Sequence, residues 1–178
     1  LISCQDLIKS YNEHLSFTLY SRNQSEDRNM KISEAMTKTE LLQFWLDEIW
    51  TNGNLDAIDQ MFCPGTEANG SIPGPGLRAD DYSDLVVAVR NLATDIKIGF
   101  KQVLEQDDWL AVRTVIDAKN AANDDPVHLS GQVFVRFEGM RVAEIYSQTD
   151  FFSLFEQLGQ IPPDALLICL TGQRLKWA

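Results

Sequence analysis

The sequence predicts an α+β domain in which helices from the first half cover one face of a curved antiparallel sheet from the second half. Apolar residues recur at helical spacing between about residues 32 and 93, and then alternate with polar residues between residues 95 and 149. Helices and strands are therefore segregated along the chain, which is typical of α+β folds. Because the sheet must bend around helices on one face, we expect a cone with an apolar interior.

Three helices are expected in the first half of this cone. The first contains LLQFWLDEIW and ends at TNGN, the second is LDAIDQMF and ends at CPG, and the third is YSDLVVAVRNLA. A loop rich in Gly and Pro separates the second helix from the third and has room for one short strand. Polar residues suited to N-capping precede each helix. These caps are Ser33 or Thr37 for the first, Asn54 for the second, and Asp80 or Asp81 for the third.

Four strands and a closing helix follow. The strand patterns cover residues 95–106, 109–118, 127–137 and 140–149. Tight turns are expected at Asp107-Asp108 and at Glu138-Gly139, and the helix begins at Asp150.

Residue composition and apolar periodicity divide the chain into three parts. Residues 1–36 are predicted to be an extension with one amphipathic helix and a polar linker, SRNQSEDRNMK, which has no apolar period. Residues 37–165 form the cone domain, and residues 166–178 form a C-terminal tail.

The composition is that of a globular domain with excess negative charge. The 178 residues are 44% hydrophobic, and 26 acidic against 15 basic residues give a formal charge of −11. Binding to nucleic acids or to anionic membrane surfaces requires a positively charged surface on the protein. We therefore expect neither as a partner.

Cysteine and histidine are too sparse for a metal site. Cys4, Cys63 and Cys169 form no CxxC pair, and His14 and His128 form no cluster with them. No dinucleotide or phosphate-loop motif occurs either, so we expect no metal and no cofactor. Unpaired cysteines favour a cytoplasmic protein. No apolar run approaches the roughly 20 residues of a membrane span, and the start, LISCQDLIKS, does not resemble a signal peptide.

Bulky side chains on the helices and strands are candidates to line the interior of the cone. Concave, aromatic-rich surfaces are typical of small-ligand pockets, although core packing is the alternative for each residue. The candidates are Trp45, Trp50, Phe62, Phe100, Phe134 or Val133, and Tyr146.

Four strings of the sequence resemble the SnoaL-like polyketide cyclase family, whose members share the cone-shaped fold named after nuclear transport factor two. The strings are LLQFWLDEIWTNGNLDAIDQMFCPG (41–65), GPGLRADDYSDLVVAVRNL (74–92), DDWLAVRT (107–114) and RFEGMRVAEIYSQTDFFSLFEQLG (136–159). The resemblance covers about residues 37–162. It implies a cystatin-like α+β barrel, a small apolar, polyketide-like ligand, acid–base chemistry without a cofactor, and a homodimer formed through the convex face of the sheet.

The resemblance also implies that the family's catalytic pair is replaced. In its cyclases an Asp near the end of the last strand acts as general acid–base, with a His beside it on the preceding strand. These positions fall on Ser147 and Val133, neither of which can act as a base at neutral pH. A register shift of one or two residues would move both assignments.

Three nearby residues remain candidates for catalysis, namely Asp150, Tyr146 and His128. Asp150 can instead cap the closing helix, which lowers a carboxyl pKa and opposes a role as base. His128 can simply be exposed or hydrogen bonded at the start of its strand. Tyr146 faces away from Ser147 unless a bulge reverses the alternation, and Glu144 is also expected on the face opposite Ser147.

The substrate-binding candidates combine the interior residues with two polar ones. For Arg113 the alternative is a salt bridge to a carboxylate on a neighbouring strand, and for Asn69 it is an Asx turn. The full set is Trp45, Trp50, Phe62, Asn69, Arg113, Val133 and Ser147.

Two functions remain open. The protein either performs cyclase-like or isomerase-like chemistry on a small apolar molecule, or it is a non-catalytic ligand-binding or dimeric assembly module. The replaced Asp and His favour the second.

Overall fold

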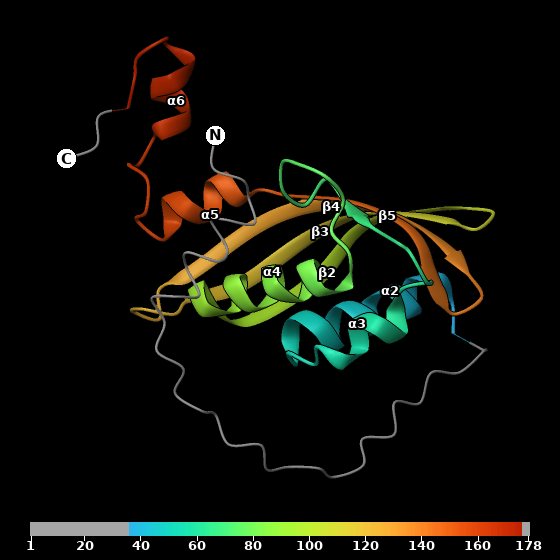
Figure 1. Cartoon of the computed structure of the whole chain (residues 1–178). Coiled ribbons are helices and arrows are strands. Elements are labelled where there is room, and N and C mark those ends of the chain that lie inside the picture. Colours follow the sequence, from blue (N-terminus) through green and yellow to red (C-terminus); the bar gives the residue numbers. More distant parts are fainter. Residues whose placement is uncertain (1–35, 176–178) are drawn as a thin grey trace. The chain divides into compact units, whose positions relative to one another are not determined.

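The computed structural model describes residues 36–175 of the chain, and these residues form the predicted α+β fold (Figure 1). Helices α2, α3 and α4 lie on one side of a long, curved sheet. The predicted extension, apart from Met36, and the last three residues of the predicted tail lie outside the described residues. The helices are α2 Lys38–Leu46, π-helix η1 Asp47–Thr51, α3 Asp56–Met61, α4 Ala79–Leu92, α5 Phe151–Gln157 and α6 Ala165–Leu170.

The first helix begins at the predicted cap Thr37. Its hydroxyl accepts a hydrogen bond from the backbone N–H of Glu40 at 3.2 Å, and the Glu40 carboxylate accepts one from the Thr37 N–H at 2.8 Å. This reciprocal pair is a capping box, which satisfies two N–H groups at the start of α2. The alternative cap, Ser33, lies outside the described residues.

The other two predicted caps are wrong. No side chain caps α3, and Leu55 precedes its first residue. The Asn54 side chain donates to the Glu48 carboxylate at 3.0 Å. The third helix begins at Ala79, so Asp80 and Asp81 lie in its first turn and not before it. Carboxylates there still favour the helix, because its N-terminus carries a partial positive charge.

The sheet has five strands in the order β1-β5-β4-β3-β2. The four predicted strands pair antiparallel as expected, and the short strand expected in the Gly-rich loop pairs parallel to the last one. The predicted turn at Glu138-Gly139 is one residue early, since Glu138 still belongs to its strand. The strands are β1 Ala68–Asn69, β2 Ala93–Gln106, β3 Trp109–Asn120, β4 Pro126–Glu138 and β5 Arg141–Thr149.

Register shifts in the ladder accompany the curvature of the sheet. Two lie in β2, between Thr94 and Lys97 and between Phe100 and Gln102, and a third lies between Arg136 and Phe137 of β4. Irregularities of this kind bend a strand and increase its twist. The long strands therefore curve over the helices, as the sequence predicts.

Two neighbouring rows of cross-strand partners separate the faces of the sheet. The inner row is Val103, Val112, Val133 and Ser147, and the outer row is Leu104, Ala111, Phe134 and Tyr146. Successive residues of a strand point to opposite faces, so the rows face opposite ways. The expected opposition of Tyr146 and Ser147 is confirmed. Of the alternatives Phe134 and Val133, it is Val133 that lies on the inner face. Phe134 and Tyr146 are 51% and 47% exposed on the outer face, so the expectation that Tyr146 lines the interior is wrong.

An unexpected helix, α6, covers the start of the predicted tail and the last residue of the predicted cone domain. Its first residue, Ala165, is fully buried, whereas Leu166, Leu167 and Leu170 are exposed. None of the helices described between residues 36 and 175 has the length and apolar character needed to cross a membrane.

Candidate functional site

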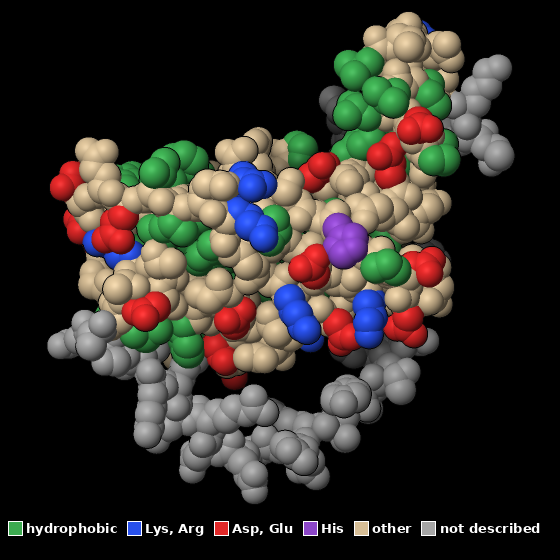
Figure 2. Space-filling model, turned by 180° about the vertical axis from the view of Figure 1, so that it is seen from behind, with side chains coloured by type: hydrophobic (Ala, Val, Ile, Leu, Met, Phe, Trp, Pro, Cys, Tyr) green, Lys and Arg blue, Asp and Glu red, His purple; other side chains and the backbone are tan. Residues whose placement is uncertain are grey.

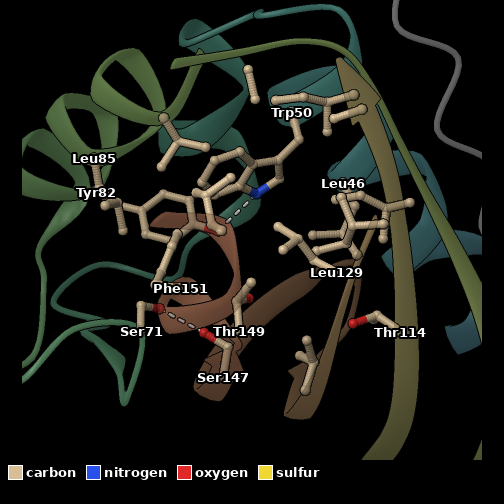
Figure 3. Close-up of a pocket in the computed structure, with 18 of the residues that line it drawn as sticks. Leu46, Trp50, Ser71, Tyr82, Leu85, Thr114, Leu129, Ser147, Thr149 and Phe151 are labelled. Carbon is tan, nitrogen blue, oxygen red and sulfur yellow. Dashed lines mark hydrogen bonds between the residues drawn. The ribbon is translucent and has the colours of Figure 1, made fainter. Parts of the chain in front are cut away.

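A mostly apolar cavity of about 80 Å³ lies between the helices and the inner face of the sheet (Figure 3). Its aliphatic walls come from α2, α4 and strands β2 to β5, and α5 contributes Phe151 and Leu154. An engineered cavity of about 150 Å³ in another protein holds benzene. An occupant of this cavity must therefore be compact, or it must displace side chains.

The polar atoms at the cavity are few and neutral. No Asp, Glu, His, Lys, Arg or Cys among the described residues lines it. The polar groups are one indole N–H and five hydroxyls, from Trp50, Ser71, Tyr82, Thr114, Ser147 and Thr149.

Two of these hydroxyls form a pair at the edge of the sheet. Ser71 Oγ lies 2.6 Å from Ser147 Oγ, so one serine donates to the other. The loop that carries Ser71 comes close to β5 because Gly70, at φ +82°, has no side chain. A Cβ there would lie 2.8 Å from the backbone oxygen of Ser147. Glycine is thus required for the contact that brings Ser71 to the cavity.

Tyr82 and Trp50 form the second polar contact, on the helical side. The Trp50 indole N–H donates to the Tyr82 hydroxyl oxygen at 3.2 Å. The Tyr82 ring packs edge-to-face on Trp50 and on Phe62, with ring centroids 6.0 Å and 5.5 Å apart. Burial raises the pKa of Tyr82 to about 12, against a smaller lowering by the Trp50 hydrogen bond. The phenol is therefore protonated at any physiological pH.

Arg90 of α4 fixes the backbone that carries Trp50. Its guanidinium donates to the carbonyl oxygen of Trp50, and to that of Thr51 at 3.0 Å. These carbonyls lie at the end of η1, where no further N–H group of the helix is present to donate to them. The position of the indole thus depends on a contact between two helices.

A polar groove of about 490 Å³ lies next to the cavity. Ser71, Thr149 and Phe151 line both the groove and the cavity. These three residues therefore separate the interior from an open surface, and a molecule entering from the groove must pass them.

A family model described as SnoaL-like polyketide cyclase matches residues 40–158, which is most of the chain. This chain belongs to the SnoaL-like polyketide cyclase family. A comparison with functionally curated proteins gives no match.

Solved structures share the fold of this SnoaL-like protein. A candidate polyketide cyclase from Acidithiobacillus ferrooxidans is 20% identical, with a TM-score of 0.61 over 72% of this chain and 99% of that one. AclR, a candidate hydroxylase from Streptomyces galilaeus, is 17% identical, with a TM-score of 0.60 over 75% and 89%. A SnoaL-like polyketide cyclase from Agrobacterium tumefaciens is 20% identical, with a TM-score of 0.56 over 70% and 99%. At these identities the likeness establishes the fold and not the activity.

Three of the predicted substrate-binding residues line the cavity, and four do not. Trp50, Val133 and Ser147 line it, and the last two are direct cross-strand partners on its wall. Trp45 and Phe62 are buried elsewhere in the core, where the Trp45 indole N–H donates to the Met140 carbonyl oxygen at 3.4 Å.

The two polar candidates lie away from the cavity. The Asn69 amide donates to the backbone oxygen of Glu67 at 3.0 Å, which is a local contact but not the predicted Asx turn. Arg113 lies in the outer groove, where its side chain donates to the Gln102 side-chain oxygen. This partner is on a neighbouring strand as expected, but it is an amide and not a carboxylate.

The three catalytic candidates lie apart from one another. The carboxylate of Asp150 accepts the Ser153 N–H at 2.9 Å, so it caps α5, and it lines the groove and not the cavity. His128 is exposed, with Nδ1 2.7 Å from Asp117 Oδ1. Tyr146 stacks on Trp109 on the outer face.

Glu144 lies on the outer face, opposite Ser147, as predicted. Its carboxylate accepts a hydrogen bond from Arg136 Nε at 2.7 Å. No group of three or more His, Cys, Asp or Glu side chains in the described part of the chain is arranged to hold a metal ion.

Sequence reasoning missed Tyr82, Ser71, Thr114 and Thr149 as site residues. Tyr82 is recognisable as an inward residue, because it shares a helical face with Leu85 and Val86. A phenol among aliphatic neighbours is a signal that its hydroxyl needs a partner. The serine lies in a loop, and nothing in its local pattern indicates that it meets Ser147.

Proposed function

We propose that this SnoaL-like protein binds a small, neutral, mostly apolar molecule in the cavity and does not carry out acid–base catalysis on it. The observation that supports this is the chemistry of the lining, which is aliphatic side chains and hydroxyls without a carboxylate or imidazole. Acid–base catalysis on a carbonyl compound needs a group that titrates near working pH within reach of the reacting atom.

The cavity also limits the charge and size of the molecule. A charged group buried without a partner is strongly disfavoured, and no cationic or anionic side chain of the described residues lines the cavity. Since similar structures carry the name polyketide cyclase, a cyclic, polyketide-like fragment is the first class to test. A polycyclic molecule needs more room than 80 Å³, so it requires movement of lining side chains such as Phe151.

An acid–base enzyme is the second candidate. It is favoured by the position of Asp150, because its groove shares Ser71, Thr149 and Phe151 with the cavity. A molecule lying across these three residues would bring its outer end toward the carboxylate.

We also propose that the protein forms a homodimer through the outer face of the sheet. The row of Leu104, Ala111, Phe134 and Tyr146 crosses four strands, and Leu104 is 74% exposed. Trp109 extends this apolar surface by stacking on Tyr146. A two-fold axis through such a row buries it against itself, which supports an isologous contact.

A cavity-filling variant tests ligand binding. Val133→Ile adds one methylene to the cavity wall, and Val103→Ile makes the same change at a 40% exposed position in the same inner row. Cyclic ketones of graded size, from cyclopentanone to 1-tetralone, are titrated by calorimetry. We expect the smallest to bind, and Val133→Ile to lower its affinity about tenfold, since overpacking costs about 1–3 kcal/mol.

Val103→Ile is expected to bind like the parent protein. The proposal fails if no ketone of the series binds, or if the two valine variants bind equally well.

A further inference from the structure

The Tyr82 hydroxyl has an unused hydrogen-bond donor at the cavity. Its oxygen accepts from the Trp50 indole, but a phenol can also donate one proton. No described residue accepts that proton. The side chain is only 4% exposed, so water outside the protein does not meet this need. A buried donor without an acceptor destabilises the folded state, and an acceptor that binds beside it removes the penalty.

The surroundings of Tyr82 offer little that could accept the proton. Trp50 is a donor, and Phe62 and Leu85 are apolar. Ser71 and Ser147 form a hydrogen bond with each other, and neither forms one with the Tyr82 hydroxyl. In Figure 3 the Tyr82 ring extends toward Trp50, whereas the serine pair lies on a separate part of the wall. The most economical acceptor is therefore an atom of a bound molecule.

We propose that Tyr82 recognises a carbonyl oxygen of the bound molecule by donating its hydroxyl proton to it. This inference rests on the proposed ligand-binding function. It narrows the ligand class from apolar molecules in general to neutral carbonyl compounds, and it makes Tyr82 the residue that selects them.

A carbonyl fits this position better than a hydroxyl or a carboxylate. A ligand hydroxyl brings a donor of its own, and the side chains around the Tyr82 hydroxyl, Trp50, Phe62 and Leu85, offer no acceptor for it. A carboxylate brings a buried charge with no cationic partner in the lining. A carbonyl oxygen needs only donors, and Tyr82 supplies one. The Trp50 N–H polarises the phenol, and such chains of hydrogen bonds strengthen each other.

An isosteric pair of probes tests this recognition. Cyclopentanone and methylenecyclopentane have nearly the same shape, but only the ketone has an acceptor oxygen. Both are titrated into the parent protein and into Tyr82→Phe, which keeps the ring packing. In the variant we expect the ketone to bind about fivefold more weakly, because one neutral hydrogen bond is lost, while the hydrocarbon binds at least as well as before.

The possible outcomes separate this inference from the proposed function. If both probes bind and Tyr82→Phe weakens them equally or not at all, recognition by Tyr82 is overturned while ligand binding stands. If neither probe binds the parent protein, both proposals fail.

An infrared measurement covers the case in which Tyr82→Phe does not fold. The carbonyl stretching frequency of bound cyclopentanone in the parent protein is compared with its frequency in hexane. We expect a shift to lower frequency, which marks a hydrogen-bonded carbonyl. An unshifted band overturns the inference without any variant.

Discussion

Single residues decide what chemistry the cavity can hold. Val133 and Ser147 lie side by side on its inner wall, and neither side chain titrates near neutral pH. Among the described lining residues Tyr82 is the one with a titratable side chain, and it remains a neutral donor because burial raises its pKa to about 12. The polar capacity of the site is therefore that of neutral hydrogen bonds, which suits selection of a ligand better than proton abstraction.

The raised pKa of Tyr82 predicts a loss of stability at high pH. The folded protein retains a proton that the unfolded chain releases between the ordinary tyrosine pKa of 10.0 and about 12. The unfolded state then binds fewer protons, so the free energy of unfolding falls as pH rises through that window. The fall is on the order of 2–3 kcal/mol.

Urea denaturation between pH 9 and pH 11.5 measures this loss. We expect Tyr82→Phe to remove it and Tyr146→Phe to keep it, since Tyr146 is exposed on the outer face. Equal pH dependence in the parent and Tyr82→Phe proteins would contradict the buried, neutral phenol.

At the scale of elements, α5 begins at Asp150 and brings Phe151 to the cavity. The carboxylate accepts the Ser153 N–H at 2.9 Å, which is the geometry of an N-cap. In the alternative function, the acid–base enzyme, Asp150 is also the catalytic base. Its roles as helix cap and as base must therefore be tested with different variants.

Asp150→Asn and Asp150→Ala separate capping from catalysis. Asparagine preserves a side-chain acceptor for the cap, whereas alanine removes it and is expected to lower stability by about 1 kcal/mol. We expect Asp150→Asn to match the parent protein in thermal stability and in ketone affinity. A ketone that is converted by the parent protein and left unchanged by Asp150→Asn would instead support the enzyme.

Local patterns predicted the elements whose cause is local. Alternation of apolar and polar residues predicted the four long strands, and the predicted cap Thr37 has its partner, Glu40, three residues away. The sequence predicted a helix through Trp50 but not that its last part is the π-helix η1. The contact of Arg90 with the carbonyl oxygens at its end joins residues about 40 apart in the chain, so no local pattern indicates it. Asn54 was mistaken for a cap for a similar reason, since nothing in the sequence indicates its bond to Glu48.

The candidate site was predictable to a similar degree. Strand parity placed Val133 and Ser147 on one face, and both line the cavity. Helical phase indicated that Trp45 and Phe62 point inward, but it cannot say which part of the interior they fill. The Ser71–Ser147 pair forms because a loop folds back on β5. The spacing of apolar residues in the sequence does not predict how that loop folds.

At the scale of the whole molecule, the two faces of the sheet differ in what they contact. The inner face forms the cavity wall, and the outer face carries the exposed row of Leu104, Ala111, Phe134 and Tyr146. Figure 2 looks onto the outer side, where hydrophobic side chains stand among acidic and basic ones. Mixed surfaces of this kind are common at protein interfaces.

A charge in the outer row tests the homodimer. Phe134→Lys places a cation in the middle of the row, whereas Gln132→Lys makes the same addition on the same strand and face, outside the row. We expect the parent protein and Gln132→Lys to sediment as dimers and Phe134→Lys as a monomer. A monomeric parent protein, or a Phe134→Lys variant that stays dimeric, rules out this interface.

The central claim is that an apolar cavity lies between the helices and the inner face of the sheet. Xenon enters dry, apolar cavities, so a crystal structure under xenon pressure tests this claim directly. The structure predicts xenon density bounded by Val133, Ile145 and Phe151. A xenon-free interior, with lining side chains occupying the space between the helices and the sheet, would contradict it.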